Sequence, residues 1–164
     1  MNLVNDLQEL ALATRLKRLS ERLSNDVSKI YKESELDFEA KWFLILELLS
    51  RQKLMAITEI ADALQLSHPA IIQFVNELLN KKLIKASTDK KDGRKRIVAL
   101  TASGKKTLEK IAPILASIQQ ENKKWIESGS ANILQILNEL EQALDEQNMY
   151  QRIKINLLQK KPNS

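Results

Sequence analysis

The sequence predicts a mainly α-helical fold with one small β-hairpin, and three observations support this prediction. Among 164 residues only three are Gly and three are Pro, and aromatic residues make up 4%. This composition disfavours a strand-rich sandwich or a glycine-looped nucleotide fold. Apolar residues recur at helical spacing over most of the chain, and the two strand-like segments flank an Asp92-Gly93 turn signal. At this length we expect a single domain, 1–164.

Residues 3–31 are expected to form one long, uninterrupted helix with an apolar face. Apolar side chains recur every three or four positions in this segment: Leu3, Leu7, Leu10, Leu12, Leu16, Leu19, Leu23, Val27 and Ile30. A polar segment, 33–37, follows, and Asp37 is suited to begin a second helix that runs to Leu49. That second helix is apolar on most sides, so we expect it to be central.

A helix, a turn and a second helix are expected over residues 58–80. Thr58 and Glu59 open a short helix that ends near Leu64. Ser67 is a good N-cap for the next helix, and Pro69 lies near its first position, where the missing N–H costs little. One side of this helix is apolar and expected inside, with Ile71, Ile72, Val75, Leu78 and Leu79; the outward side has Ser67, His68, Ala70, Gln73, Asn76 and Glu77.

The expected hairpin is strongly basic. Its strands are residues 83–87 and 96–100. Residues 81–96 hold eight Lys or Arg and two Asp, a net charge of +6, whereas the other 148 residues sum to −1. The chain's overall charge of +5 is therefore concentrated at this hairpin, and the basic side chains nearest its turn are Lys90, Lys91, Arg94, Lys95 and Arg96.

Two long helices are expected after the hairpin. Thr101 caps the first, from Ala102 to about Glu127, and Pro113 should kink it or mark a break. The second runs from about 131 to 158 and is followed by a frayed tail, 160–164. The apolar stripes of the first and last helices could be covered within the chain or could form a seam between two copies. Nothing else in the chain is large enough to cover both, which favours a dimer.

Several function classes are excluded by composition. The chain has no Cys and one His, so disulfides, thiol switches and the usual zinc sites are ruled out. It contains no P-loop, dinucleotide loop or nucleophile elbow. We therefore predict no catalytic residue, no metal site, no cofactor and no enzyme activity. The N-terminus lacks signal-peptide features and no apolar run approaches a membrane span, which predicts a cytoplasmic protein without a membrane partner.

The helix pair and the hairpin together point to double-stranded DNA as the partner. Short polar side chains at a helix N-terminus suit entry into the major groove, where base edges are read. A basic hairpin that directly follows can contact phosphates or reach the minor groove, the arrangement of a winged helix. A single Arg near the hairpin tip suits a narrow minor groove, and Arg94 is the candidate.

Four motifs in this order resemble the winged helix-turn-helix of the MarR family of bacterial transcription regulators: ITEIADALQLSHPA (57–70), LLNKKLI (78–84), DKKDGRKR (89–96) and VALTASG (98–104). The resemblance covers about residues 36–110. It implies a DNA-binding part, 36–100, and dimerisation helices, 1–31 and 101–160. It also implies a homodimer on a pseudo-palindromic operator, acting as a repressor that a small-molecule effector relieves.

The resemblance also implies site residues. Asp92, Arg94 and Arg96 match the family's wing motif, whereas Gly93 stands where Arg is frequent and Lys82 where Gly is common. The full set of expected DNA-binding residues is Ser67, His68, Ala70, Gln73, Lys90, Lys91, Asp92, Arg94, Lys95 and Arg96.

Three alternatives remain open from the sequence. Trp42 and Phe43 either line an effector cavity, as the resemblance suggests, or belong to the helix core. His68 could be a metal ligand, a pH switch or an effector contact, although an exposed position at the start of the DNA-reading helix is favoured. The chain as a whole could instead be a helical protein- or RNA-interaction module that uses the basic hairpin.

Overall fold

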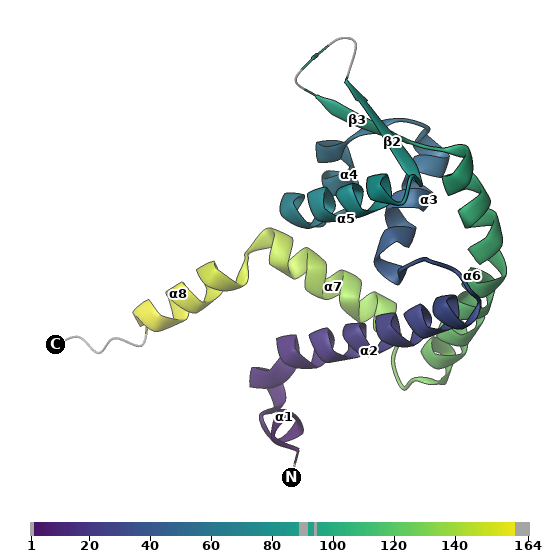
Figure 1. Ribbon diagram of the computed structural model, residues 1–164. Coiled ribbons are helices and arrows are strands. Elements are labelled where there is room, and N and C mark those ends of the chain that lie inside the picture. Colours follow the sequence, from purple (N-terminus) through teal and green to yellow (C-terminus); the bar gives the residue numbers. More distant parts are fainter. Residues whose placement is uncertain (1, 89–91, 94, 160–164) are drawn as a thin grey trace. The chain divides into compact units, whose positions relative to one another are not determined.

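The computed structural model describes residues 2–88, 92–93 and 95–159, and the chain divides into two compact units, Met1–Ala116 and Ser117–Ser164. The predicted fold class is confirmed: helices dominate, with a small antiparallel sheet (Figure 1). The first unit holds α1 (Leu3–Asp6), the 3-10 helix η1 (Gln8–Ala11), α2 (Leu12–Glu33), the 3-10 helix η2 (Ala40–Trp42), α3 (Phe43–Gln52), β1 (Met55–Ala56), α4 (Ile57–Leu64), α5 (His68–Asn80), β2 (Ile84–Thr88) and β3 (Arg96–Leu100).

Helix α6 (Ala102–Ser128) begins in the first unit and ends in the second, which also holds α7 (Ile133–Glu146) and α8 (Met149–Gln159). Of the two alternatives expected at Pro113, a kink or a break, the break is wrong, because α6 continues through this residue. Pro113 is exposed, and a proline at an exposed position removes one helical hydrogen bond without burying a polar group. None of the helices in the described part of the chain is both long enough and apolar enough to cross a membrane.

The uninterrupted helix expected over 3–31 is wrong, because the helical run breaks before α2. Gln8 has a φ of 46°, in the left-handed region, and the Leu10 N–H donates to the Leu7 carbonyl in a tighter 3-10 turn. Neither Gly nor Pro marks this position in the sequence. From Leu12 onward α2 is continuous for 22 residues, and near its end Tyr31 is buried.

The second helix starts later than expected, so the prediction that Asp37 begins it is wrong. Glu39 is extended, η2 then forms a single 3-10 turn, and α3 begins at Phe43. Asp37 instead forms an ion pair with Lys81, just after α5. The prediction that this helix is central is confirmed, and the fully buried side chains around it come from α2 to α6: Tyr31, Ile45, Leu46, Leu49, Ile60, Ile71, Val75, Leu78, Val98 and Ile111.

The sheet has the strand order β1-β3-β2, and both pairings are antiparallel. The expected hairpin is confirmed, with Ile84 opposite Leu100 and Thr88 opposite Arg96. Strand β1 is not among the elements that the sequence predicts. Two residues are too short to show a strand period, and Met55 pairs with Val98 only because the fold brings it to the free edge of β3.

The turn between α5 and β2 explains how Lys82 replaces the glycine that is common there. Lys82 has a φ of 57°. The Leu83 N–H donates to the Leu78 carbonyl at 3.0 Å and the Lys82 N–H to the Leu79 carbonyl at 2.9 Å. These are the two hydrogen bonds of a Schellman helix end, which requires a left-handed residue at this position. Lys82 therefore accepts a conformation that glycine adopts at lower cost.

The single last helix expected over 131–158 is also wrong, because it is divided into α7 and α8. Gln147 is extended, which ends α7. Asn148 then caps α8: its side-chain oxygen accepts from the Gln151 N–H at 3.0 Å, and the Gln151 side chain accepts from the Asn148 N–H at 3.2 Å. Such reciprocal capping favours a new helix start over continuation.

Candidate nucleic-acid interface

Helix α5 presents a polar face beside a buried one. The predicted N-cap is confirmed, since the Ser67 hydroxyl accepts from the Ala70 N–H at 3.4 Å. Ile71, Val75 and Leu78 are buried, and Gln73 and Asn76 lie exposed on the opposite face. The expectation that Ile72 lies on the inner side of this helix is wrong, because Ile72 is 38% exposed.

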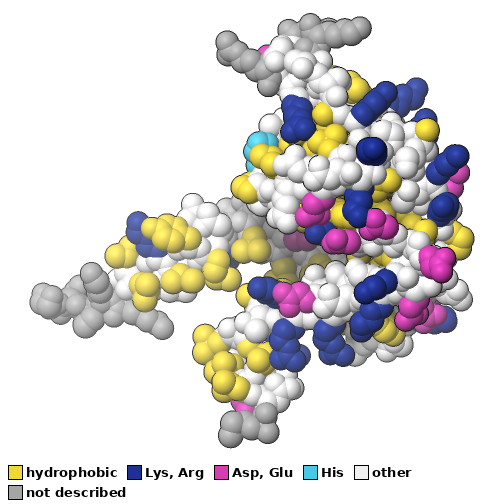
Figure 2. All heavy atoms as spheres, viewed as in Figure 1, with side chains coloured by type: hydrophobic (Ala, Val, Ile, Leu, Met, Phe, Trp, Pro, Cys, Tyr) yellow, Lys and Arg dark blue, Asp and Glu magenta, His cyan; other side chains and the backbone are white. Residues whose placement is uncertain are grey.

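The start of α5 and the turn end of the hairpin share one surface. A cavity of about 340 Å³ is lined by Ala56, Ile57, Thr58, His68, Ile72, Lys95 and Arg96. It brings His68 together with two of the expected basic residues, although they are far apart in the sequence. Figure 2 shows the His side chain at the surface, next to hydrophobic and basic side chains. The favoured exposed position of His68 is thereby observed.

The structure describes only some of the other expected site residues. Asp92 is exposed, and its carbonyl accepts from the Lys95 N–H at 2.9 Å. Ala70 is half-buried in the first turn of α5. Lys90, Lys91 and Arg94 lie outside the described residues.

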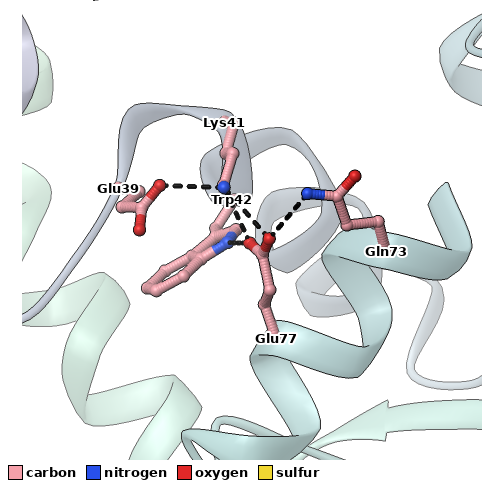
Figure 3. Close-up of polar contacts among 5 residues, drawn as sticks. All are labelled: Glu39, Lys41, Trp42, Gln73 and Glu77. Carbon is pink, nitrogen blue, oxygen red and sulfur yellow. Dashed lines mark hydrogen bonds and ion pairs between the residues drawn. The ribbon is translucent and has the colours of Figure 1, made fainter. Parts of the chain in front are cut away.

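A polar cluster around Glu77 was missed by the sequence analysis. Figure 3 shows the Glu77 carboxylate surrounded by donors from two elements. The Trp42 indole N–H donates to Oε2 at 2.7 Å, the Lys41 ammonium lies 2.9 Å from Oε2, and the Gln73 amide donates to Oε1 at 3.1 Å. Lys41 also pairs with Glu39 at 2.9 Å. Glu77 was expected to face outward, and this is wrong, because its side chain is 28% exposed and joins α5 to η2.

Trp42 lies in the core. It is 2% exposed, and its ring meets Phe38 edge to face at 5.8 Å. The indole N–H is satisfied by Glu77, as a buried Trp requires. Phe43 is half-buried against the same core. Of the two alternatives for Trp42, an effector cavity or the helix core, the structure shows the core. A ligand contact by Trp42 or Phe43 stays a prediction.

Part of this cluster had a sequence signal. Gln73 and Glu77 are four apart, so they face each other on one helix. Trp42 and Lys41 are more than 30 residues away from Glu77, and no local pattern indicates that contact.

The cluster shifts the pKa of both charged partners. Burial raises the pKa of Glu77, but hydrogen bonds from Lys41, Trp42 and Gln73 outweigh it, so that the pKa lies below its ordinary value. Burial lowers the pKa of Lys41, yet hydrogen bonds to Glu77 and Glu39 raise it above the ordinary value. Both groups are therefore charged at neutral pH, and Glu77 acts only as a hydrogen-bond acceptor.

We expect Glu77 to contribute to stability at neutral pH and not in acid. Its pKa is lower in the folded chain than the unfolded value of 4.5, so folding releases protons between the two values and stability rises with pH there. The contribution is present above about pH 4.5 and is lost as the pH falls through the folded value. Glu77→Gln should cost about 1 kcal/mol at pH 7.

Urea unfolding between pH 3 and 7 measures this difference, which should shrink as the pH falls below about 4.5. Glu47→Gln is the control, because Glu47 has a similar exposure, 33%, and pairs with Arg51 on α3. A gap between wild type and Glu77→Gln that stays constant with pH would contradict the assignment.

The comparisons with known proteins agree with this geometry. Residues 36–95 match the MarR family. The DNA complex of MepR from S. aureus has the same fold, with a TM-score of 0.66 and 22% identity over 82% of this chain and 97% of that chain. A mutant MarR from E. coli in complex with operator DNA gives a TM-score of 0.62 and 20% identity, covering 88% of this chain and 99% of that chain.

A third similar structure is the PcaV regulator from Streptomyces coelicolor in complex with its natural ligand. Its TM-score is 0.65 and its identity 17%, over 85% of this chain and 93% of that chain. No curated protein shows significant sequence similarity to the chain. At these identities the solved structures establish the fold.

Proposed function

We propose that this chain, whose residues 36–95 match the MarR family, is a DNA-binding transcription regulator that acts as a homodimeric repressor whose DNA affinity a small ligand lowers. One observation carries the proposal. The exposed start of α5 and the basic turn end of the hairpin, at Lys95 and Arg96, border the same cavity, so a major-groove helix and a phosphate-binding hairpin can meet one duplex together.

The proposed DNA contacts follow from this surface. The start of α5 enters the major groove, where its free N–H groups and short side chains meet phosphates and base edges. The hairpin follows the backbone, and Arg94 at its turn reaches a minor groove. The contacting residues we propose are Ser67, His68, Ala70, Gln73, Lys90, Lys91, Asp92, Arg94, Lys95 and Arg96.

Exposed leucines support the homodimer. Leu12, Leu16, Leu19 and Leu23 of α2 are 37–47% exposed, and their spacing places them on one face of the helix. Helices α7 and α8 carry exposed apolar side chains of their own, among them Ile133, Leu134, Leu140, Leu144, Ile153 and Leu157. A second copy would cover such faces, and its second winged module would require a pseudo-palindromic operator.

The regulatory ligand is proposed by analogy with similar folds. PcaV was solved with its natural ligand, and BpsR is described as a protein whose DNA binding is regulated by 6-hydroxynicotinic acid. In this chain a ligand would change the spacing of two α5 helices so that both no longer fit successive major grooves. Trp42 and Phe43 stay our predicted ligand contacts, and a regulator of this kind acts in the cytoplasm.

Titration of the purified chain with labelled duplexes tests the proposal. One probe is the promoter region next to its own gene, and the other is a random duplex of equal length. We expect the promoter to be bound at least about 1,000-fold more tightly at physiological salt, with affinity that falls steeply as salt rises. Equal binding of both probes, or preferential binding of RNA, would favour an interaction module instead.

Arg94→Ala is expected to weaken promoter binding about tenfold and to leave the unfolding midpoint unchanged. Loss of one phosphate-neutralising cation also lowers the slope of log affinity against log salt by about 0.9. Fluorescence anisotropy at several salt concentrations measures both effects. Arg51→Ala is the matched control, because Arg51 pairs with Glu47 on α3. Unchanged affinity in the Arg94 variant would remove this residue from the contact surface.

A further inference from the structure

The amide of Gln73 has a fixed orientation on the exposed face of α5. Its nitrogen donates to Glu77 Oε1 at 3.1 Å, and Figure 3 shows its oxygen pointing away from Glu77. The orientation has a chemical cause. An ionised carboxylate offers no proton, so the amide must turn its NH₂ group, and not its oxygen, toward Glu77.

Glu77 is itself held in place by the core. Its other oxygen accepts from the indole of Trp42, which is 2% exposed. Lys41 binds the same carboxylate and also pairs with Glu39, and its ammonium lies 5.6 Å from the ring centre of Phe74 on α5. The carboxylate is thus fixed by two donors from η2, and this fixed carboxylate in turn orients the Gln73 amide.

We propose that Glu77 is a positioning residue that fixes the Gln73 amide so that α5 reads adenine in the major groove. The inference rests on the proposed function, because it needs α5 to meet base edges. Adenine presents an acceptor at N7 and a donor at N6. With one N–H bound to Glu77, Gln73 keeps one N–H for N7 and its oxygen for N6.

Guanine does not fit this arrangement. It presents acceptors at both N7 and O6, so the outward oxygen of Gln73 would face another oxygen. Reading guanine would require the amide to flip, and the flipped amide would place its oxygen against the Glu77 carboxylate.

The full chain and a pool of duplexes with a randomised 20-base-pair centre test the inference. Bound duplexes are selected over several rounds and sequenced. Wild type should enrich adenine over guanine about tenfold or more at one position of each half-site. Gln73→Ala should lose the preference at that position and keep it elsewhere. Gln73 is exposed, so this variant is expected to fold.

Glu77→Gln is the decisive variant. Trp42 and Lys41 are donors and take the single oxygen of the new amide, so its NH₂ faces Gln73. The Gln73 amide then flips and presents two N–H donors outward, and enrichment at the position shifts toward guanine. When Glu77→Gln is added to Gln73→Ala, the double variant should show the same base preference as Gln73→Ala alone. Glu47→Gln, the control for a lost surface ion pair, should keep the wild-type preference.

Two results would overturn the inference. One is an adenine preference that survives in Glu77→Gln; the other is a Gln73-dependent position at which wild type selects a base other than adenine. A purely structural role for Glu77 would lower the unfolding midpoint without changing the base preferred at a single position, and so gives the first of these results. A wild-type pool without any enriched sequence would instead overturn the proposed function.

Discussion

Replacing Gly104 by Ala is expected to lower the free energy of unfolding by about 3 kcal/mol or more. Gly104 is buried in the first turn of α6. A Cβ atom there would lie 2.1 Å from the Leu83 carbonyl oxygen and 3.0 Å from Leu100 Cδ2. The first distance is far inside van der Waals contact, and the obstructing atom belongs to the backbone.

The backbone at Leu83 cannot move without breaking hydrogen bonds. Its carbonyl accepts from the Thr101 N–H at 3.1 Å and from the Thr101 hydroxyl at 3.0 Å. Its N–H closes the end of α5 through Leu78. A shift that makes room for a methyl group would therefore break the connection between α5, the sheet and α6.

Urea unfolding measured by circular dichroism checks this prediction. Gly93→Ala is the matched control, because a Cβ atom at Gly93 has no neighbour within 4 Å, and its effect should stay within about 0.5 kcal/mol. A loss below about 1 kcal/mol in the Gly104 variant would mean that the α6 start and Leu83 are not packed as closely as described.

Replacing Leu16 and Leu19 together by Glu is expected to dissociate the proposed dimer and to weaken promoter binding at least about a hundredfold. These side chains are 41% and 45% exposed in the single chain, so the charges do not disturb its core. In a seam between two copies they would be buried without partners, which is costly. A separated module also loses the effective concentration that links two half-sites.

Sedimentation at micromolar concentration and duplex titration measure the two effects. Thr14→Glu with Lys17→Glu is the control, because both positions are exposed on α2 and lie away from the leucine face. The control should remain dimeric. A Leu16 and Leu19 variant that stays a dimer would contradict the proposed role of this face, and a monomer with unchanged promoter affinity would contradict the need for two modules.

The site could be predicted only in part. Ser67, Gln73 and the basic hairpin were recognisable because capping, helical spacing and charge density are visible within a few residues. The partners of Glu77 were not, because Trp42 and Lys41 reach it from a distant segment. The cavity that His68 and Arg96 share was not predictable either, because the fold brings these two residues together from distant segments.

The sequence by itself determined the elements whose signals are local: the helix that Ser67 caps, the hairpin around Asp92-Gly93 and the cap at Thr101. Hydrogen bonds and side-chain contacts within about four residues decide such features, and a pattern along the chain reports them directly. Only the tertiary structure decided why residue 104 is glycine, why Met55 becomes a strand and how Trp42 and Lys41 hold Glu77. Each of these features depends on an atom that the fold brings close from elsewhere in the chain. The free energy of such a contact depends on residues that are distant in the sequence, so no local pattern reports it.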